Sequence, residues 1–555
     1  MSVSPSDSAQ ELYGLDPELR QMVLDTVGQL KKRLLSKEMV LEWDQKEIFP
    51  EDKIREMLGP EIGLQLLMIP EQYGGMGGGA RDSCIVTRAM SKICLGIGTA
   101  FFAIQLGADP LVVGGTQEQK QKWLGKIAEG QALVAYAVTE PGAGSDVANI
   151  KTKADPVTND AGEITGYKIN GTKQFISTGA AADFITLLAK TPEGPTFFVI
   201  EKGTEGFEPG RSEEKHGIRA SQTSALSFTD VFVPIENLIG GVPGNGLKQA
   251  NQVFGYTRLM VAAMGLGAGE AALEIAIPYA KERFVSGSML SEKQGYTHKL
   301  IVPNAVKLEA AAAFIDEIAT RLDAGERDLQ VEGSIAKYFA TEAANQTADN
   351  AMQALGGNGY INEFEVEKIK RDVKITCIYE GASEVQQSII STFRWRTNVK
   401  SKGEFYGSLA AQMHKMEETF GNAGCRLLGL AATTLGDTVM LVHRNRLTRT
   451  QYIMFALADM ITYVEVGSAL ARKAAIAAQA NGAEAEKLRL TSKIFANQVA
   501  RLVAQNVMTI VMGSGAFDQQ TAAEFIGAAK LNELAQTYQD IILDMDRVAD
   551  IIFER

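Results

Sequence analysis

The sequence predicts an α+β protein, mainly α-helical, with a small antiparallel β-domain in the middle of the chain. Amphipathic segments separated by glycine and proline occupy residues 10 to 133, and DPELRQMVLDTVGQLKKRLL is typical of them. Short β-prone runs with turn residues between them occupy residues 134 to 240. Long helical periods with few breakers return from about residue 246 and continue to the end. The order along the chain is therefore helices, sheet, helices and further helices.

A chain of 555 residues with 45% hydrophobic content can form several cores. We expect four domains: an N-terminal helical domain (1–133), a middle β-domain (134–245), a C-terminal four-helix bundle (246–400) and an additional helical domain (401–555). The net charge is −12 and no long basic cluster is present, which argues against a nucleic-acid-binding protein.

The middle domain is predicted from short runs bounded by turn residues. YKINGTKQFISTG carries Asn170-Gly171 between two β-prone runs, which is a hairpin signal. FITLLAK, TFFVIEK and ALSFTDVFVP follow as further strands.

The C-terminal extension carries a stripe of Ile453, Leu457, Met460 and Val464, spaced by fours and threes as on one helix face. An exposed stripe of this size would promote association, so we expect the bundle at 300 to 395 to cover it within the same chain.

The extension also resembles a second, degenerate copy of the bundle. KYFATEAANQTADNAM (337 to 352) and KIFANQVARLVAQNVM (493 to 508) align without a gap, and each precedes a glycine turn. The pairs Tyr379-Glu380 and Tyr538-Gln539 follow, so the second copy has an amide where the first has an acid. Several shared positions are alanines in alanine-rich helices, so a chance match is the alternative.

The cysteines and histidines argue against metal or triad chemistry. Four cysteines are scattered without CxxC spacing, and the four histidines are isolated. We expect no metal, a reducing compartment and no Ser-His-Asp mechanism.

No targeting segment is recognised in the sequence. The N-terminal residues MSVSPSDSAQELYG lack the basic start and the apolar run of a signal peptide, so a cytoplasmic location is expected. The late stretch IMFALADMITYVEVGSALA is interrupted by Asp459 and Glu465, and we expect it to be too polar to span a bilayer.

Three short segments carry chemical meaning. In CIYEGASEVQQSII, Glu380 precedes a helical run, so it is either an ordinary helix N-terminal charge or a base. In AYAVTEPGAGSDVANIKTKA, a Gly142-Ala143-Gly144-Ser145 turn lets the main chain approach a polar ligand, although a plain tight turn is the simpler interpretation. In QALGGNGY, a helix ends at glycines, for which a C-cap is the simplest interpretation.

Taken together and in this order, YAVTEPGAGSD, QALGGNGY and CIYEGASE resemble the acyl-CoA dehydrogenase family over roughly residues 20 to 395. The long C-terminal extension resembles that of very-long-chain acyl-CoA dehydrogenases. The resemblance implies FAD as cofactor, an acyl-CoA substrate of fatty-acid β-oxidation and electron-transfer flavoprotein as acceptor. It implies that Glu380 removes the α-proton of the thioester while the β-hydrogen leaves as hydride to flavin N5. Thr257 stands where some relatives carry the base, and it cannot accept that proton.

The same resemblance implies roles for further residues. The family's flavin-binding positions are matched here by Tyr136, Thr139, Ser145, Phe175, Ser177 and Glu384. The positions that reach the ADP half of FAD from a neighbouring subunit are matched by Arg283, Gln294, Gln353 and Gly357. The substrate-binding positions are matched by Ser145, Arg258 and Gly381.

Three positions depart from the family pattern. Ser286 replaces an aromatic stacking partner, and Ala382 replaces a threonine hydroxyl, each contact worth roughly 1 kcal/mol. Gly255 replaces an acidic residue found near the CoA adenine in some members.

The acyl group is not readable from the sequence. Gly98 and Gly107 would deepen a channel and Phe101 and Phe102 would shorten it, while the absence of an arginine there disfavours a glutaryl-type substrate.

Two alternatives to the dehydrogenase remain: a flavin oxidase on the same fold, and a non-catalytic assembly protein. We expect a homodimer rather than a tetramer, because the extension would cover the surface through which dimers join. Attachment of the extension to a membrane through Arg444, Arg446, Arg449, Arg472 and Lys473 is an alternative use of that region.

Overall fold

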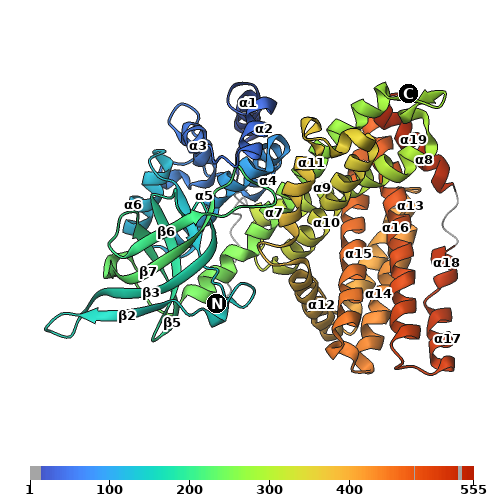
Figure 1. Cartoon of the computed structure of the whole chain (residues 1–555). Coiled ribbons are helices and arrows are strands. Elements are labelled where there is room, and N and C mark those ends of the chain that lie inside the picture. The colour runs from blue at the N-terminus through green and yellow to red at the C-terminus, as the bar shows by residue number, and fades with distance from the viewer. Residues whose placement is uncertain (1–13, 480–481, 536–539) are drawn as a thin grey trace, which may run out of the picture. The chain divides into compact units, whose positions relative to one another are not determined.

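The computed structural model describes residues 14–479, 482–535 and 540–555, and the chain forms two compact units (Figure 1). The first comprises Met1–Met260 and Asp316–Gln330, and the second comprises Val261–Ile315 and Val331–Arg555. The four sequence-based domain boundaries stay a prediction.

The helices of the first unit precede its sheet. They are α1 (Pro17–Arg33), α2 (Lys37–Gln45), α3 (Glu51–Leu58), α4 (Ala80–Ile93), α5 (Leu95–Gly114) and α6 (Gln117–Ala128), and the first part of α7 (Gly246–Glu282) follows the sheet. The segment expected to be an amphipathic helix is α1, and Asp16 caps it by accepting a hydrogen bond from the Leu19 backbone at 2.9 Å.

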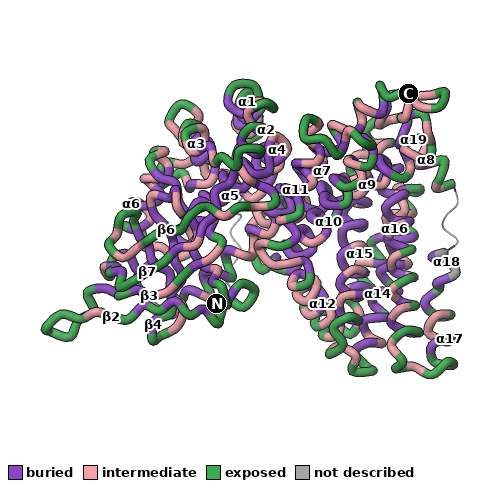
Figure 2. Tube along the Cα trace, viewed as in Figure 1, coloured by how far each residue is buried: buried purple, intermediate pink, exposed green. Residues whose placement is uncertain are grey.

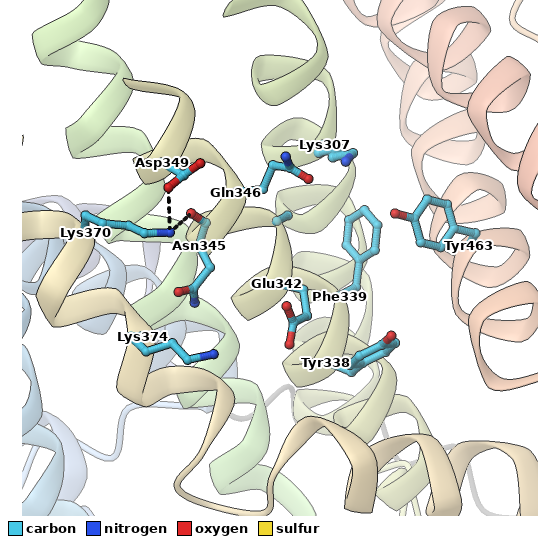
Figure 3. A pocket seen from close by; sticks show the side chains of 11 residues that line it. Lys307, Tyr338, Phe339, Glu342, Asn345, Gln346, Asp349, Lys370, Lys374 and Tyr463 are labelled. Atoms are coloured by element: carbon cyan, nitrogen blue, oxygen red, sulfur yellow. Dashed lines mark hydrogen bonds and ion pairs between the residues drawn. The ribbon is translucent and has the colours of Figure 1, made fainter. Parts of the chain in front are cut away.

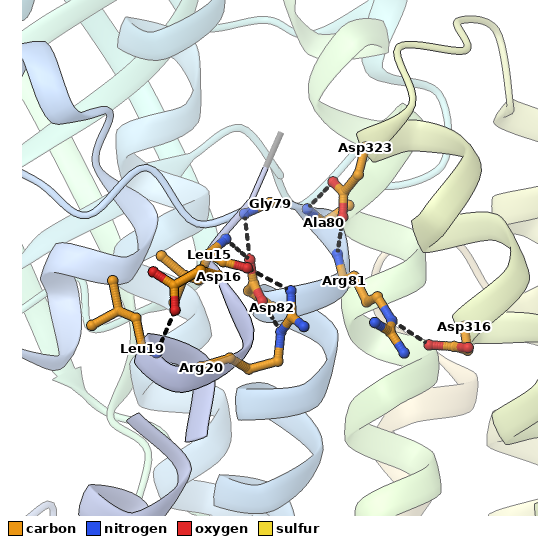
Figure 4. A network of polar contacts seen from close by, with 10 residues as sticks. All are labelled: Leu15, Asp16, Leu19, Arg20, Gly79, Ala80, Arg81, Asp82, Asp316 and Asp323. Atoms are coloured by element: carbon orange, nitrogen blue, oxygen red, sulfur yellow. Dashed lines mark hydrogen bonds and ion pairs between the residues drawn. The ribbon is translucent and has the colours of Figure 1, made fainter. Parts of the chain in front are cut away.

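Two buried acids organise the start of α4 (Figure 4). Asp82 accepts hydrogen bonds from the backbone of Leu15 at 2.7 Å and of Gly79 at 3.0 Å, and from the Arg20 side chain. Asp323, near the end of α9 (Val302–Asp323), accepts from the first two amides of α4, at 2.6 and 3.0 Å. These carboxylates satisfy donors that a helix N-terminus leaves unpaired.

A seven-stranded sheet completes the first unit, with order β1-β4-β2-β3-β7-β6 and β5 paired to β4. The strands are β1 (Val134–Ala137), β2 (Lys153–Thr158), β3 (Ile164–Ser177), β4 (Phe184–Thr191), β5 (Gly194–Glu201), β6 (Phe207–Ser212) and β7 (Thr223–Pro234). Most pairs are antiparallel, as expected, but β4 pairs in parallel with β1 and β2. β4 is buried on both faces along its first six residues, and Lys190 is exposed near its end. Figure 2 shows buried and exposed residues along the whole chain.

The hairpin predicted at Asn170-Gly171 was wrong. Both residues lie inside β3, where the register against β7 shifts between Ile169 and Gly171. Gly171 has φ +152° and marks a bulge, and the Asn170 side chain donates to Asp230 across the strand pair at 3.1 Å. The pairing of β3 with two neighbours therefore overrides the local turn preference.

The second unit is helical, apart from the short pair β8 (Phe284–Val285) and β9 (Ser288–Met289). Its helices are the second part of α7, α8 (Gln294–Tyr296), most of α9, α10 (Gln330–Leu355), α11 (Val366–Val373), α12 (Ser383–Lys400), α13 (Glu404–Thr419), α14 (Cys425–Arg444), α15 (Gln451–Ala478), α16 (Ala483–Gly513), α17 (Gln519–Ala528), α18 (Leu531–Ala535) and α19 (Ile541–Phe553). The expectation of a mainly helical α+β fold is confirmed.

The apolar stripe of the extension is covered within the chain, as expected. Its four residues lie on α15 and are at most 5% exposed. α15 packs against α12, α14 and α16. Since α12 belongs to the region 300 to 395, the extension is folded back on its own subunit.

A charged cluster is buried between α12 and the extension. Arg394 donates to Glu465 through two bonds of 2.8 Å and to Glu332 at 2.9 Å, and Tyr406 donates to Glu465 at 3.0 Å. Burial disfavours the charged guanidinium, but the two carboxylates more than offset this and hold the pKa of Arg394 above its ordinary value.

Four helices of the described chain are long and apolar enough to cross a membrane by length and composition: α5, α7, α14 and α15. The expectation that the α15 stretch is too polar was therefore wrong. Between 67% and 83% of the apolar window in each helix is buried inside the protein.

The two blocks of the expected repeat both lie in helices, 337 to 352 in α10 and 493 to 508 in α16. The equivalent rings of Phe339 and Phe495 contact each other edge to face at 5.5 Å. Tyr538 and Gln539 lie outside the described residues, so the repeat stays a prediction.

Candidate active site

Glu380 lies in a tight loop immediately before α12. The 3₁₀ turn Lys374–Cys377 ends just ahead of it, and α12 begins at Ser383. Glu380 has φ +54° and Gly381 has φ +92°. A glutamate in the left-handed region costs about 1–3 kcal/mol, and such strain is found most often at functional sites.

Buried side chains hold this loop from two helices. Gln386 of α12 donates to the carbonyl oxygens of Glu380 and Gly381, both at 3.0 Å, and Lys337 of α10 donates to the Gly381 carbonyl at 2.7 Å. Both side chains are fully buried. Sequence reasoning missed them, because nothing local in the sequence connects α10 with the loop. Glu384, predicted to contact the flavin, is exposed in the first turn of α12.

The departure at Ala382 has a visible consequence. Ala382 is the N-cap residue of α12 and provides no side-chain hydrogen bond to the helix. Ser383 instead donates to Glu342 at 2.5 Å.

We expect Ala382→Thr to stabilise the protein by about 1 kcal/mol, because a threonine hydroxyl at an N-cap accepts from the first turn. Urea unfolding of both proteins measures the difference. Ala410→Thr, in the buried interior of α13, is the control and is expected to destabilise.

In the first unit a buried ion pair joins two of the predicted flavin segments. Lys173 of β3 donates to Glu140 at 2.8 Å and to the Val138 carbonyl at 2.9 Å. Burial lowers the pKa of Lys173 to about 8, against the opposing effect of Glu140. Burial favours the neutral form of Glu140, but hydrogen bonds from Lys173 and Thr152 hold its pKa below the ordinary value.

This pair brings the predicted residues of β3 next to those that follow β1. The backbone N–H of Gln174 donates to the Thr139 carbonyl at 2.9 Å. Phe175 and Ser177 therefore lie on the strand that contacts Thr139. Phe175 has φ +59° and is 65% exposed, so a large apolar ring is held on the surface. Tyr136 is half-buried in β1, where its ring lies 5.7 Å from that of Phe197.

The glycine turn that follows is open to solvent. Ser145 is exposed, and a Cβ placed on Gly142 or Gly144 would meet no atom within 4 Å. A planar ligand could therefore lie against this loop and the Phe175 ring.

The predicted substrate residue Arg258 lies half-buried on α7. The neighbouring Thr257 is fully buried. A Cβ on Gly255 would meet only Gln330, at 3.9 Å, so space remains where some relatives carry an acid.

In the second unit the four residues predicted for the ADP half of FAD are all exposed. Two hydrogen bonds connect the segments that carry them. Tyr296 donates to the Ala354 carbonyl at 3.2 Å, which joins the Gln294 segment to the end of α10. Asn358 donates to Tyr279 at 3.3 Å, which joins the turn after α10 to the end of α7, where Arg283 follows. Neither tyrosine was singled out from the sequence.

The last helix of the extension contacts the same region. Gln294 donates to Asp546 of α19 at 2.9 Å. Lys281 pairs with Glu554 at 2.6 Å, and Arg555 donates to the Ser291 carbonyl at 2.8 Å. The extension therefore holds one of the residues predicted to contact FAD.

A cavity of about 510 Å³ is lined by residues of α9, α10, α11 and α15 and of the turn after α11 (Figure 3). Its walls are mainly polar: Lys307, Tyr338, Phe339, Glu342, Ala343, Asn345, Gln346, Asp349, Lys370, Lys374 and Tyr463. Lys370 pairs there with Asp349 at 3.2 Å. None of the predicted catalytic, cofactor-binding or substrate-binding residues lines it, so it is not assigned to the active site.

The glycines expected to deepen an acyl channel serve packing instead. A Cβ on Gly98 would lie 2.4 Å from the Ser91 hydroxyl of α4, and one on Gly107 would lie 2.8 Å from Val134 of β1. Phe101 and Phe102 are both buried in α5. The expectation was wrong for the two glycines, because close packing against α4 and β1 leaves no space at them. The part about Phe101 and Phe102 stays a prediction.

Comparison with known proteins identifies three matching family models. They are described as acyl-CoA dehydrogenase N-terminal domain, middle domain and C-terminal domain, and they match residues 17–131, 135–231 and 244–393. The three models cover most of the chain and leave the extension outside.

Two curated relatives match the same region. An acyl-CoA dehydrogenase of Bacillus subtilis is 35% identical over 381 residues, which cover 65% of this chain and 98% of the relative. A short-chain-specific acyl-CoA dehydrogenase of Clostridium acetobutylicum is 37% identical over 361 residues, with 64% and 92% covered.

Two solved structures are also similar. A chain from a structure of the electron transferring flavoprotein of Acidaminococcus fermentans is 34% identical, with TM-score 0.63, over 68% of this chain and 97% of that chain. An acyl-CoA dehydrogenase complexed with FAD from Bacillus anthracis has TM-score 0.82 at 24% identity and covers 99% of this chain and 97% of that chain, so its fold includes the extension. With three matching domain models and relatives covered almost end to end, the chain belongs to the acyl-CoA dehydrogenase family.

Proposed function

We propose that the protein catalyses FAD-dependent α,β-dehydrogenation of an acyl-CoA thioester, with Glu380 as the base. The observation that carries this proposal is the loop before α12, which holds a glutamate in a strained backbone conformation between buried hydrogen bonds. Bound FAD would accept the β-hydrogen as hydride.

The chain's own contribution is to remove the α-proton and to stabilise the enolate that develops. The carboxylate of Glu380 takes the proton from Cα. By family resemblance the Glu380 backbone N–H donates to the thioester oxygen, so the same strained residue supplies both base and donor. Arg258 and Ser145 are proposed to bind the CoA part.

The described residues fit FAD. The exposed Phe175 ring, the half-buried Ser177 and the open turn at Gly142 and Gly144 suit a planar ring system. Arg283, Gln294 and Gln353 are each exposed and offer a cation and amides, which suit a pyrophosphate and its nucleoside.

Arg283→Ala is expected to release FAD on dilution, because its planar guanidinium can bind phosphate through two parallel hydrogen bonds. Helical circular dichroism should remain unchanged, since Arg283 is exposed at the end of α7. FAD absorbance after gel filtration measures occupancy.

Arg327→Ala is the control for this variant. Arg327 is also exposed but lies in the loop before α10. Full FAD occupancy in Arg283→Ala would remove Arg283 from the cofactor site.

We propose electron-transfer flavoprotein as the acceptor, supported by similarity to a chain from a structure described as the electron transferring flavoprotein of Acidaminococcus fermentans. The alternative is a flavin oxidase. Rapid mixing of the reduced protein with oxygen separates them, since an oxidase reoxidises quickly and a dehydrogenase slowly. Protein purified without FAD, and unable to take it up, would instead favour the assembly-protein alternative.

We propose a homodimer. In support, the residues predicted for the ADP half of FAD are exposed in the single chain, beside the exposed Phe284 and Tyr360 rings. Light scattering measures the assembly, and a tetramer would contradict the proposal. A cytoplasmic location is part of the same proposal.

The acyl group is best determined by turnover. Short, long, branched and cyclic acyl-CoAs compared side by side with an artificial electron acceptor would identify the preferred class. No turnover of any member, in protein with full FAD, would contradict the proposed function.

A further inference from the structure

The loop that carries Glu380 needs support from its surroundings. Glu380 and Gly381 are consecutive residues with positive φ, and L residues other than glycine adopt this conformation at a cost. A Cβ on Gly381 would lie 2.3 Å from the Gln386 amide nitrogen, so the loop lies directly against that side chain.

Two side chains bind the carbonyl groups on either side of Gly381. Gln386 donates to the Glu380 and Gly381 oxygens, both at 3.0 Å, and Lys337 donates to the Gly381 oxygen at 2.7 Å. Each carbonyl oxygen belongs to a rigid peptide plane. Fixing the two planes therefore restricts the φ and ψ torsions of Gly381 and the ψ torsion of Glu380.

The choice of lysine at position 337 is informative. Its side chain is fully buried in α10, where an apolar side chain of the same length would cost far less to bury. Its hydrogen bond to the Gly381 carbonyl, which an apolar side chain could not make, accounts for a lysine at this buried position.

We propose that Lys337 and Gln386 are positioning residues, which together hold the Glu380-Gly381 loop in the conformation required for α-proton removal. This inference rests on the proposed function of Glu380. Both side chains act through hydrogen bonds to the carbonyl groups of the loop.

Three variants separate these contributions. Lys337→Met removes charge and hydrogen bond at similar length, and Gln386→Met removes only hydrogen bonds. Lys368→Met is the control, because Lys368 is also a buried lysine of the second unit but pairs with Asp372 at 2.5 Å. Thermal unfolding of all three identifies any general loss of stability.

The first measurement is amide hydrogen exchange in peptides covering residues 378 to 386, which does not depend on activity. We expect exchange about tenfold faster in Lys337→Met and Gln386→Met, because the loop opens more often. Lys368→Met should leave these peptides unchanged.

The second measurement is steady-state kinetics with the best acyl-CoA of the panel above. We expect kcat to fall about tenfold or more in both positioning variants with KM within about twofold, since a misplaced base affects chemistry more than binding.

The outcomes are decisive in each direction. Unchanged loop exchange in both variants, or kinetics that match Lys368→Met, would overturn the inference. If Lys337→Met does not fold, Gln386→Met alone decides through exchange and kcat. If the wild-type protein turns over no acyl-CoA, the proposed function fails, whereas the exchange comparison still tests whether the two side chains hold the loop.

Discussion

Glu380→Gln is expected to lose turnover by about a hundredfold or more while keeping FAD and substrate binding. Amide and carboxylate have nearly the same shape, so the loop and its hydrogen bonds to Gln386 and Lys337 should persist. The amide cannot take a proton, and loss of a general base commonly costs this much in rate. The measurement is kcat with the preferred acyl-CoA, together with FAD content and substrate titration of the flavin spectrum.

The matched control tests the simpler interpretation of Glu380 as an ordinary helix N-terminal charge. Glu404 is exposed in the first turn of α13, where it too lies near a positive helix end. Glu404→Gln should alter stability by less than about 1 kcal/mol and leave turnover unchanged. Near-normal turnover in Glu380→Gln would show that the base lies elsewhere.

The fold class could be predicted because periodicity and turn residues are local signals. The amphipathic pattern of α1 and the apolar stripe of α15 each appear within one helix, and the structure buries the predicted faces. The predicted position of Glu380 ahead of a helix was likewise correct, since α12 begins at Ser383.

The sequence was misleading where packing between distant segments decides the outcome. Asn170-Gly171 has hairpin chemistry, but β3 continues through it because strands on both sides pair with it. Gly98 and Gly107 suggested space, although they mark places where α5 approaches α4 and β1 too closely for a side chain. The residues that contact β3 and Gly107 lie far from them in the sequence, and Ser91 contacts Gly98 from the preceding helix.

The supporting residues of the site could not be predicted for the same reason. Glu140 and Lys173 form a buried pair between two segments of the first unit, and Lys337 reaches Gly381 from another helix. Taken alone, each is an ordinary charged residue in the sequence. Only the fold shows that each lies next to a residue with a proposed function.

Arg394→Met is expected to destabilise the protein by about 3–5 kcal/mol, because it leaves two buried carboxylates without their cation. Glu332 and Glu465 are each about 9% exposed, and both bind the same guanidinium. Methionine fills much of the volume of arginine, so the loss is mainly electrostatic. Urea unfolding followed by circular dichroism measures the change.

Arg396 provides the control for this prediction, since it lies on the same helix two residues later and is exposed. Arg396→Met should change stability by less than about 0.5 kcal/mol. Replacing Glu332 and Glu465 by glutamine in the Arg394→Met background should restore part of the loss, because no buried negative charge then remains. If Arg394→Met were as stable as Arg396→Met, the cluster would not hold α12 against the extension.

Arg394 of α12 is bound by Glu465 of α15, which Tyr406 of α13 also contacts, so we expect the bundle and the extension to unfold together. A chain ending near residue 400 should therefore expose the α12 face and aggregate.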